Sequence, residues 1–174
     1  MGKKKINPRR IPMAKSSIDR QAITEEATRD NLKQAWIVVA STLVDLEYAI
    51  PAEIPTLSDA ISKYITKNNL HGEQLRSALR RGEELCGLPY PYANLHADDI
   101  RSEVELAAFK RKVKKIALHT AFCVICLGLE GTGRYTTEDL RKIFFSVDLT
   151  QAEIERGITS YEEIENSLEA VIDI

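Results

Sequence analysis

Long apolar runs and aromatic side chains are scarce in this chain of 174 residues. Its longest apolar stretch, Ala117–Leu129, contains His119 and Thr120 and is too short and too polar to span a bilayer. No apolar core or small-residue cleavage site follows the basic N-terminus, so a secretory signal is not indicated. The three cysteines cannot all pair with one another. We therefore expect reduced thiols in a cytoplasmic protein.

Catalytic motifs are also lacking. No serine or cysteine stands in a nucleophile motif, and no glycine-rich loop matches a phosphate cradle. Acidic pairs such as Asp98 and Asp99 stand at an expected helix start, where the helix dipole and solvation explain them. We predict that the protein is not an enzyme and needs no cofactor.

No run with the period of a β-strand is long enough to be convincing, so the sequence predicts an all-α fold. Two long helices are expected. The first begins at Ser16 or Ser17, and its segment ends at Pro51 and Pro55; the second runs from about Asp98 to Leu129. The first has an apolar stripe within about 100° of arc, made of Leu32, Ala35, Trp36, Val39, Leu43 and Leu46. The second has a packing seam at 3-4 spacing, made of Leu106, Phe109, Val113, Ile116, Thr120, Cys123 and Leu127.

Several short capped helices are predicted around these two. Thr56 with Asp59 forms a capping box, and Gly87 ends the helix that holds Leu75, Leu79 and Cys86. After Gly131–Gly133, three further start signals stand at Thr137, at Thr150 with Glu153, and at Ser160 with Glu163. Residues 1–15 are expected to form a flexible basic arm, and 16–174 a single helical domain, with sub-lobes 16–95 and 96–174 as an alternative.

Charge is distributed unevenly along the chain. Residues 1–15 hold six bases and no acid, whereas residues 130–174 hold eleven acids and four bases. This polarity favours contacts with other macromolecules over turnover of a small molecule.

Two sets of side chains are candidates for those contacts. The nucleic-acid candidates are Lys3, Lys4, Lys5, Arg9 and Arg10 in the arm, and Lys110, Arg111, Lys112, Lys114 and Lys115, which fan over about 200° of the second long helix. The candidates for an acidic partner-binding surface are Glu138, Asp139, Glu153, Glu155, Glu162, Glu163 and Glu165. The simpler alternative is a set of solvated helix faces and a basic tail.

Four side chains have the chemistry of zinc ligands. His119, Cys123 and Cys126 fall on one helix face, and Cys86 is a fourth. Their apolar neighbours favour buried cysteines that act as small hydrophobic residues, so we predict no metal site.

Four stretches resemble a group of small proteins from phages and prophages of Firmicutes: Gly2–Pro12, Ala117–Phe122, Thr136–Leu140 and Gly157–Ile164. The chain is also similar to phage-encoded inhibitors of type II CRISPR nucleases, although Gly131-Thr132-Gly133 replaces their usual glycine–aromatic–glycine turn.

The resemblance implies a protein of the bacterial host cytoplasm that binds a type II CRISPR effector nuclease with its guide RNA and blocks target DNA recognition or cleavage. Such effectors hold the RNA–DNA heteroduplex in a positively charged channel. The alternatives are a phage DNA-binding accessory or regulatory protein, and a helical protein-interaction module that forms a homo-oligomer through its seam helix.

Overall fold

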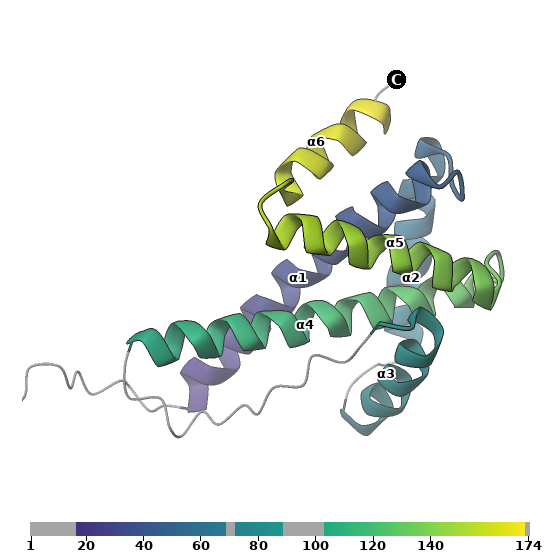
Figure 1. Ribbon diagram of the computed structural model, residues 1–174. Coiled ribbons are helices and arrows are strands. Elements are labelled where there is room, and N and C mark those ends of the chain that lie inside the picture. The colour runs from purple at the N-terminus through teal and green to yellow at the C-terminus, as the bar shows by residue number, and fades with distance from the viewer. Residues whose placement is uncertain (1–16, 69–71, 89–102, 173–174) are drawn as a thin grey trace, which may run out of the picture.

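The computed structural model describes residues 17–68, 72–88 and 103–172, with side chains in 31–68, 77–88 and 103–169. In these ranges the chain forms α1 (Ser17–Asp45), the 3-10 helix η1 (Pro51–Glu53), α2 (Ile54–Lys67), α3 (Gly72–Cys86), α4 (Glu103–Gly131), α5 (Thr137–Glu155) and α6 (Tyr161–Ile172) (Figure 1). The predicted all-α fold with two long helices is confirmed. The arm predicted at residues 1–15 and the helix start predicted at Asp98 lie outside the described residues.

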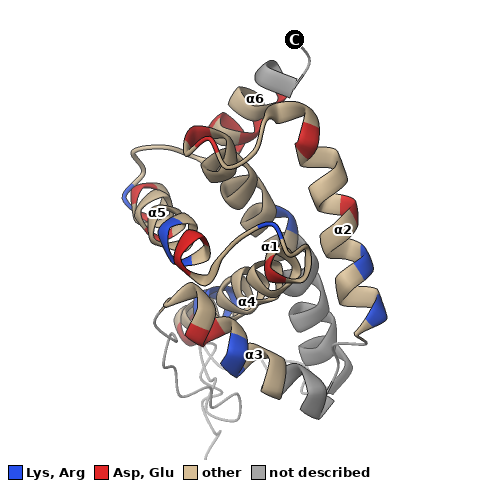
Figure 2. Ribbon diagram, turned by 90° about the vertical axis from the view of Figure 1, so that its right-hand side faces the viewer, with Lys and Arg blue, Asp and Glu red and all other residues tan. Residues whose placement is uncertain are grey.

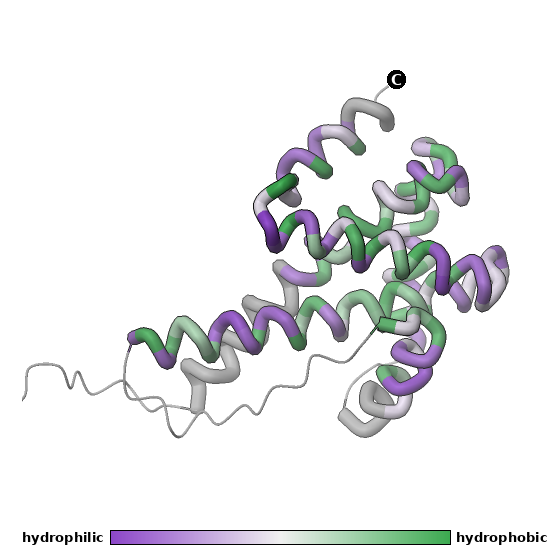
Figure 3. Tube along the Cα trace, viewed as in Figure 1, coloured by the Kyte–Doolittle hydropathy of each residue, from purple (hydrophilic) through white to green (hydrophobic). Residues whose placement is uncertain are grey.

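Helix α4 is the centre of the fold and contacts α1, α2, α3 and α5. Its second half is wrapped on all sides, because every residue from Ala121 to Leu129 is buried. Its first half alternates polar and apolar residues, as Figure 3 shows along the same helix. The change from a half-exposed to a fully covered helix agrees with the sequence pattern, in which Lys112 and Lys115 give way to Phe122 and Cys126 on one face.

Close contacts with α4 depend on glycine. A Cβ atom built on Gly82 of α3 would lie 2.8 Å from Cys123 Cβ and 2.9 Å from the Cys123 carbonyl oxygen. A Cβ on Gly128 of α4 would lie 2.9 Å from Ile61 Cγ1 of α2. Both helices therefore approach α4 more closely than any larger residue at these positions would allow.

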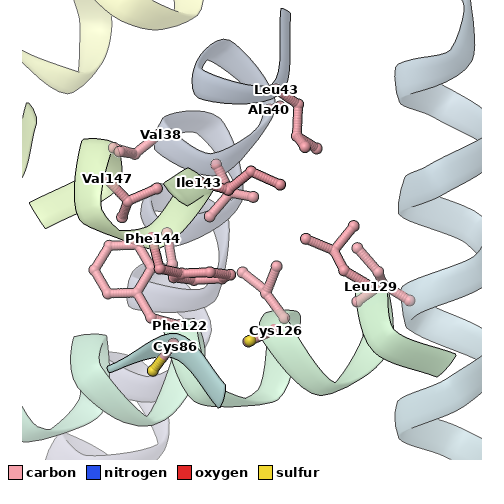
Figure 4. Packing of buried hydrophobic residues seen from close by; sticks show 14 of the residues in the cluster. Val38, Ala40, Leu43, Cys86, Phe122, Cys126, Leu129, Ile143, Phe144 and Val147 are labelled. Carbon is pink, nitrogen blue, oxygen red and sulfur yellow. The ribbon is translucent and has the colours of Figure 1, made fainter. Parts of the chain in front are cut away.

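The core joins α1 to α4 and α5. Helix α1 contributes Val38 and Leu43, and α5 contributes Phe144, all fully buried. The rings of Phe122 and Phe144 meet edge to face with centroids 6.4 Å apart, and Figure 4 shows both side chains between α4 and α5. The α1 stripe is buried only in its middle, whereas Leu32 and Leu46 at its two ends are exposed.

The start of α2 differs from the prediction. We expected a capping box at Thr56 and Asp59, but the helix begins at Ile54 and Pro55 lies in its first turn. The carboxylate of Glu53 accepts the backbone N–H of Ile50 at 3.0 Å and closes the preceding turn instead. Proline is tolerated there because the first turn of a helix needs no N–H donor.

Helix α5 corrects two further expectations. Thr136, one residue before the expected Thr137, is the N-cap: its Oγ1 accepts the Asp139 N–H at 3.2 Å, and Asp139 Oδ2 accepts the Thr136 N–H at 2.9 Å. The helix then runs unbroken to Glu155, so Thr150 with Glu153 starts no new helix. No glycine or proline interrupts this segment, and a threonine within it does not end a helix whose inner face is packed.

The remaining boundaries follow the sequence signals. Ser160 and Glu163 form the expected capping box, with the Ser160 N–H donating to Glu163 Oε2 at 2.8 Å and the Glu163 N–H donating to Ser160 Oγ at 3.2 Å. Gly87, Gly133 and Gly157 follow helices α3, α4 and α5 with φ between 68° and 70°, the left-handed backbone that favours glycine after a helix.

Candidate nucleic-acid interface

Five basic side chains, here called the basic face, project from the first half of α4: Lys110, Arg111, Lys112, Lys114 and Lys115. All are exposed, while Val113 is buried beneath them. No acidic residue occurs between Glu105 and Glu130 in the sequence. The helix therefore presents a purely positive surface over more than half of its circumference along this stretch.

The members of the basic face differ in how firmly they are held. Lys115 Nζ lies 3.2 Å from Glu155 Oε1 of α5, and Lys114 Nζ lies 5.9 Å from the centroid of the Tyr161 ring of α6. Lys110 and Lys112 make no ion pair with any residue that the structure describes. Among the described residues no carboxylate pairs with Lys110 or Lys112, whereas Lys115 is tied to α5 and Lys114 to α6.

Sequence reasoning missed Tyr161 as a neighbour of the basic face. The two sites are more than forty residues apart in the sequence, and no local pattern connects them. The arm bases Lys3, Lys4, Lys5, Arg9 and Arg10 lie outside the described residues.

Most carboxylates of the predicted acidic surface already make capping hydrogen bonds or ion pairs within the protein. Asp139 and Glu163 cap α5 and α6, and Glu138, Glu155 and Glu165 pair with Lys142, Lys115 and Lys33. Hydrogen bonds from Thr136 lower the pKa of Asp139. Of these seven, only Glu153 and Glu162 are exposed and make no side-chain hydrogen bond or ion pair with the described residues. The seven carboxylates lie on α5 and α6, and bases are interspersed with them on α5 but not on α6 (Figure 2).

The four side chains with zinc-ligand chemistry do lie together, between α3 and α4. His119 Nε2 is 3.6 Å from Cys123 Sγ and 3.2 Å from Glu83 Oε1. Cys86 contacts the Cys123 and Cys126 thiols, and hydrogen bonds to Cys86, together with burial, raise the pKa of both Cys123 and Cys126. Those two groups therefore stay protonated.

The three cysteines also belong to the buried hydrophobic core. All three cysteines are free and buried. Among the side chains that the structure describes, no group of three or more His, Cys, Asp or Glu is arranged to hold a metal ion. Buried thiols that contact one another and apolar neighbours contribute to packing as small hydrophobic groups.

Two shallow pockets flank α4. One, of about 150 Å³, lies between α4 and α5 and includes Leu118, His119, Phe122 and Val147. The other, of about 270 Å³, lies between α1 and α2 beside Trp36 and Ile61. Pockets for small organic ligands typically measure about 300–1,000 Å³, so both are smaller than such sites. Contacts with a macromolecular surface fit this shape better.

Comparison with protein families, with curated proteins and with solved structures found no match to this chain. None of the described helices has the length and apolar character needed to cross a bilayer. The resemblance to phage inhibitors therefore stays a prediction from the sequence.

Proposed function

We propose that this protein binds the phosphate backbone of a nucleic acid through the basic face of α4. The observation that carries the proposal is the row of five exposed bases, uninterrupted by any acid, on the half of the helix that the core leaves uncovered. Side chains in this arrangement follow a phosphate backbone without reading its sequence.

The expected strength follows from counterion release. Each phosphate neutralised on duplex DNA contributes about −0.9 to the slope of log affinity against log salt concentration. Lys110, Arg111 and Lys112 make no ion pair with any described residue, so they should contribute most of that slope. Lys114 and Lys115 would first have to leave Tyr161 and Glu155.

Fluorescence anisotropy with labelled duplex DNA and with RNA, measured across a salt series, tests the proposal. The triple variant Lys110→Gln, Arg111→Gln, Lys112→Gln should lower the slope on duplex DNA by about 2 to 3. The matched control is Lys63→Gln, Lys67→Gln, Arg80→Gln, which removes the same charge from exposed positions on α2 and α3. An equal decrease of the salt slope in both triple variants would mean that the net charge of the protein alone drives binding.

We further propose that the nucleic acid is bound within a type II CRISPR effector nuclease that carries its guide RNA, and that binding blocks target DNA recognition or cleavage. The sequence resemblance and the exposed basic face of α4 support this partner. Cleavage of a target by purified nuclease and guide, with the protein at saturation, tests it: undiminished cutting contradicts the inhibitor. Undiminished cutting combined with tight, salt-dependent binding to free duplex DNA would instead favour the DNA-binding accessory protein.

A further inference from the structure

Helix α5 has a second apolar site on the side that faces away from the core. Its inner face buries Leu140, Ile143, Phe144 and Val147. On the outer face Phe145 is 67% exposed and Leu149, one turn later, is 53% exposed. Figure 2 shows α5 at the edge of the molecule, with no other labelled helix beyond it. Two large apolar side chains are thus held in water next to each other.

These two residues belong to a regular seam, which we call the outer seam. Its members follow one another at steps of 4, 3, 4, 3 and 4 residues: Glu138, Lys142, Phe145, Leu149, Ala152 and Arg156. This is the spacing of the contact positions of a coiled coil, in which one helix lies against another over its whole length. None of the six belongs to the buried inner face of α5: Phe145 and Leu149 are exposed, Ala152 is half-buried, and Glu138 and Lys142 pair with each other at 2.8 Å.

Two copies of the outer seam are complementary in charge and in apolar character when their helices lie antiparallel. The residues are placed symmetrically about position 147, so an antiparallel second copy sets Phe145 against Leu149 and Glu138 against Arg156. The exposed Glu153 then lies beside Lys142 of the other copy. A parallel copy would instead set Glu138, Lys142 and Arg156 each against itself, which like charges oppose.

We propose that two copies of this chain associate through the outer seam of α5 as an antiparallel, two-fold symmetric dimer. Such an interface is isologous, and every contact occurs twice. Phe145 and Leu149 form its apolar centre, and the ion pairs with Glu138, Lys142, Glu153 and Arg156 set its direction. A contact made by one helix from each copy falls in the class of small interfaces, below about 1,200 Å², so the dimer should dissociate on dilution.

Sedimentation velocity of the full chain, from micromolar to millimolar concentration, tests the proposal. We expect a concentration-dependent dimer for the wild type, and Phe145→Gln should raise the dissociation constant by roughly a hundredfold because the side chain is lost from both copies. Val104→Gln is the matched control, since Val104 is also largely exposed, at 76%, but lies on α4. A wild type that stays monomeric at millimolar concentration overturns the proposal, as does a Phe145→Gln variant that dimerises as well as the control.

A charge exchange tests the antiparallel register independently of the apolar centre. Lys142→Glu and Glu153→Lys should each raise the dissociation constant by about tenfold, because each change creates two like-charge contacts. The double variant should recover the wild-type value, since position 142 of one copy again faces an opposite charge at position 153 of the other. Circular dichroism verifies that each variant is folded. Failure of the double variant to recover overturns the register.

The dimer and the proposed nucleic-acid binding are separable. Lys110, Arg111 and Lys112 lie on α4 and are unchanged in all of these variants. If the α5 variants lose dimerisation but keep their nucleic-acid affinity per chain, the result supports the outer seam alone. If the α4 variants lose nucleic-acid affinity but still dimerise, the result supports the basic face alone.

Discussion

Gly82 lies at the tightest contact between α3 and α4, and replacing it with alanine should push the two helices apart. The added Cβ would stand 2.8 Å from Cys123 Cβ, 2.9 Å from the Cys123 carbonyl oxygen and 3.1 Å from Cys123 Cα. Two of these three atoms are backbone, and the third is bonded directly to it. No side-chain rotation can therefore relieve the contact, and a helix has to move.

The size of the effect is set by two opposing terms. Overpacking in a well-packed core costs about 1–3 kcal/mol, and a contact with backbone belongs to the upper part of that range. Alanine is favoured over glycine within a helix by about 1 kcal/mol. We expect a net loss of about 1–2 kcal/mol in the free energy of unfolding, which for a chain of this length lowers Tm by roughly 3–6 °C.

Thermal unfolding followed by circular dichroism measures this loss, and thiol labelling reports its cause. Cys86, Cys123 and Cys126 are buried in the contact, so Gly82→Ala should label faster than the wild type under native conditions. Ser77→Ala, at an exposed position of the same helix, is the control for helix propensity and should leave Tm equal or slightly higher with unchanged labelling. An unchanged or raised Tm for Gly82→Ala would refute the argument that α3 is held at this distance by the missing Cβ.

Two further predictions concern the caps and the ion pair near the end of α4. Thr136→Ala should cost about 1 kcal/mol of stability because the N-cap hydrogen bond is lost, whereas Thr137→Ala should cost little; equal Tm values for the two variants would contradict the assignment of the cap. Arg134 donates to both carboxylate oxygens of Glu53 at 2.9 Å and to the Tyr48 carbonyl at 3.1 Å, and its hydrogen bonds lower the pKa of Glu53. Because the pKa of Glu53 is lower in the folded state, its ionised form stabilises the fold at pH values above the unfolded pKa of about 4.3. This stabilisation is lost as the pH falls through the folded pKa. Arg134→Gln should therefore have a lower Tm than wild type at neutral pH, and the difference should narrow in acid; a difference independent of pH would show that the Glu53 contact is not its source.

Local signals were sufficient to predict much of the fold. Glycine after a helix and a hydroxyl before an acidic residue act within a few residues, so Gly87, Gly157 and the Ser160–Glu163 box could be found without tertiary information. The same signals were not sufficient at the start of α2, where the Glu53 carboxylate closes the preceding turn with the Ile50 N–H. Arg134 also holds that carboxylate from 81 residues away in the sequence, a contact for which no local signal exists.

The basic face was visible in the sequence because charge on a helix depends only on residue spacing. Its attachment to α5 and α6 through Glu155 and Tyr161 was not. The predicted acidic surface is the opposite case. The sequence shows how many carboxylates residues 130–174 contain, but only the structure reveals that most of them already serve as caps or ion-pair partners.

The sequence by itself determined that the chain is helical, which stretches become the two long helices, and that the first half of α4 carries bases while its second half is apolar. These properties follow from residue period and local capping, which do not depend on the rest of the molecule. Only the tertiary structure decided which apolar residues are buried. Phe144 and Phe145 are adjacent and chemically identical, yet one is fully buried and the other largely exposed. The rotation of α5 against α1 and α4 makes that choice, and it leaves the outer seam available for a second copy.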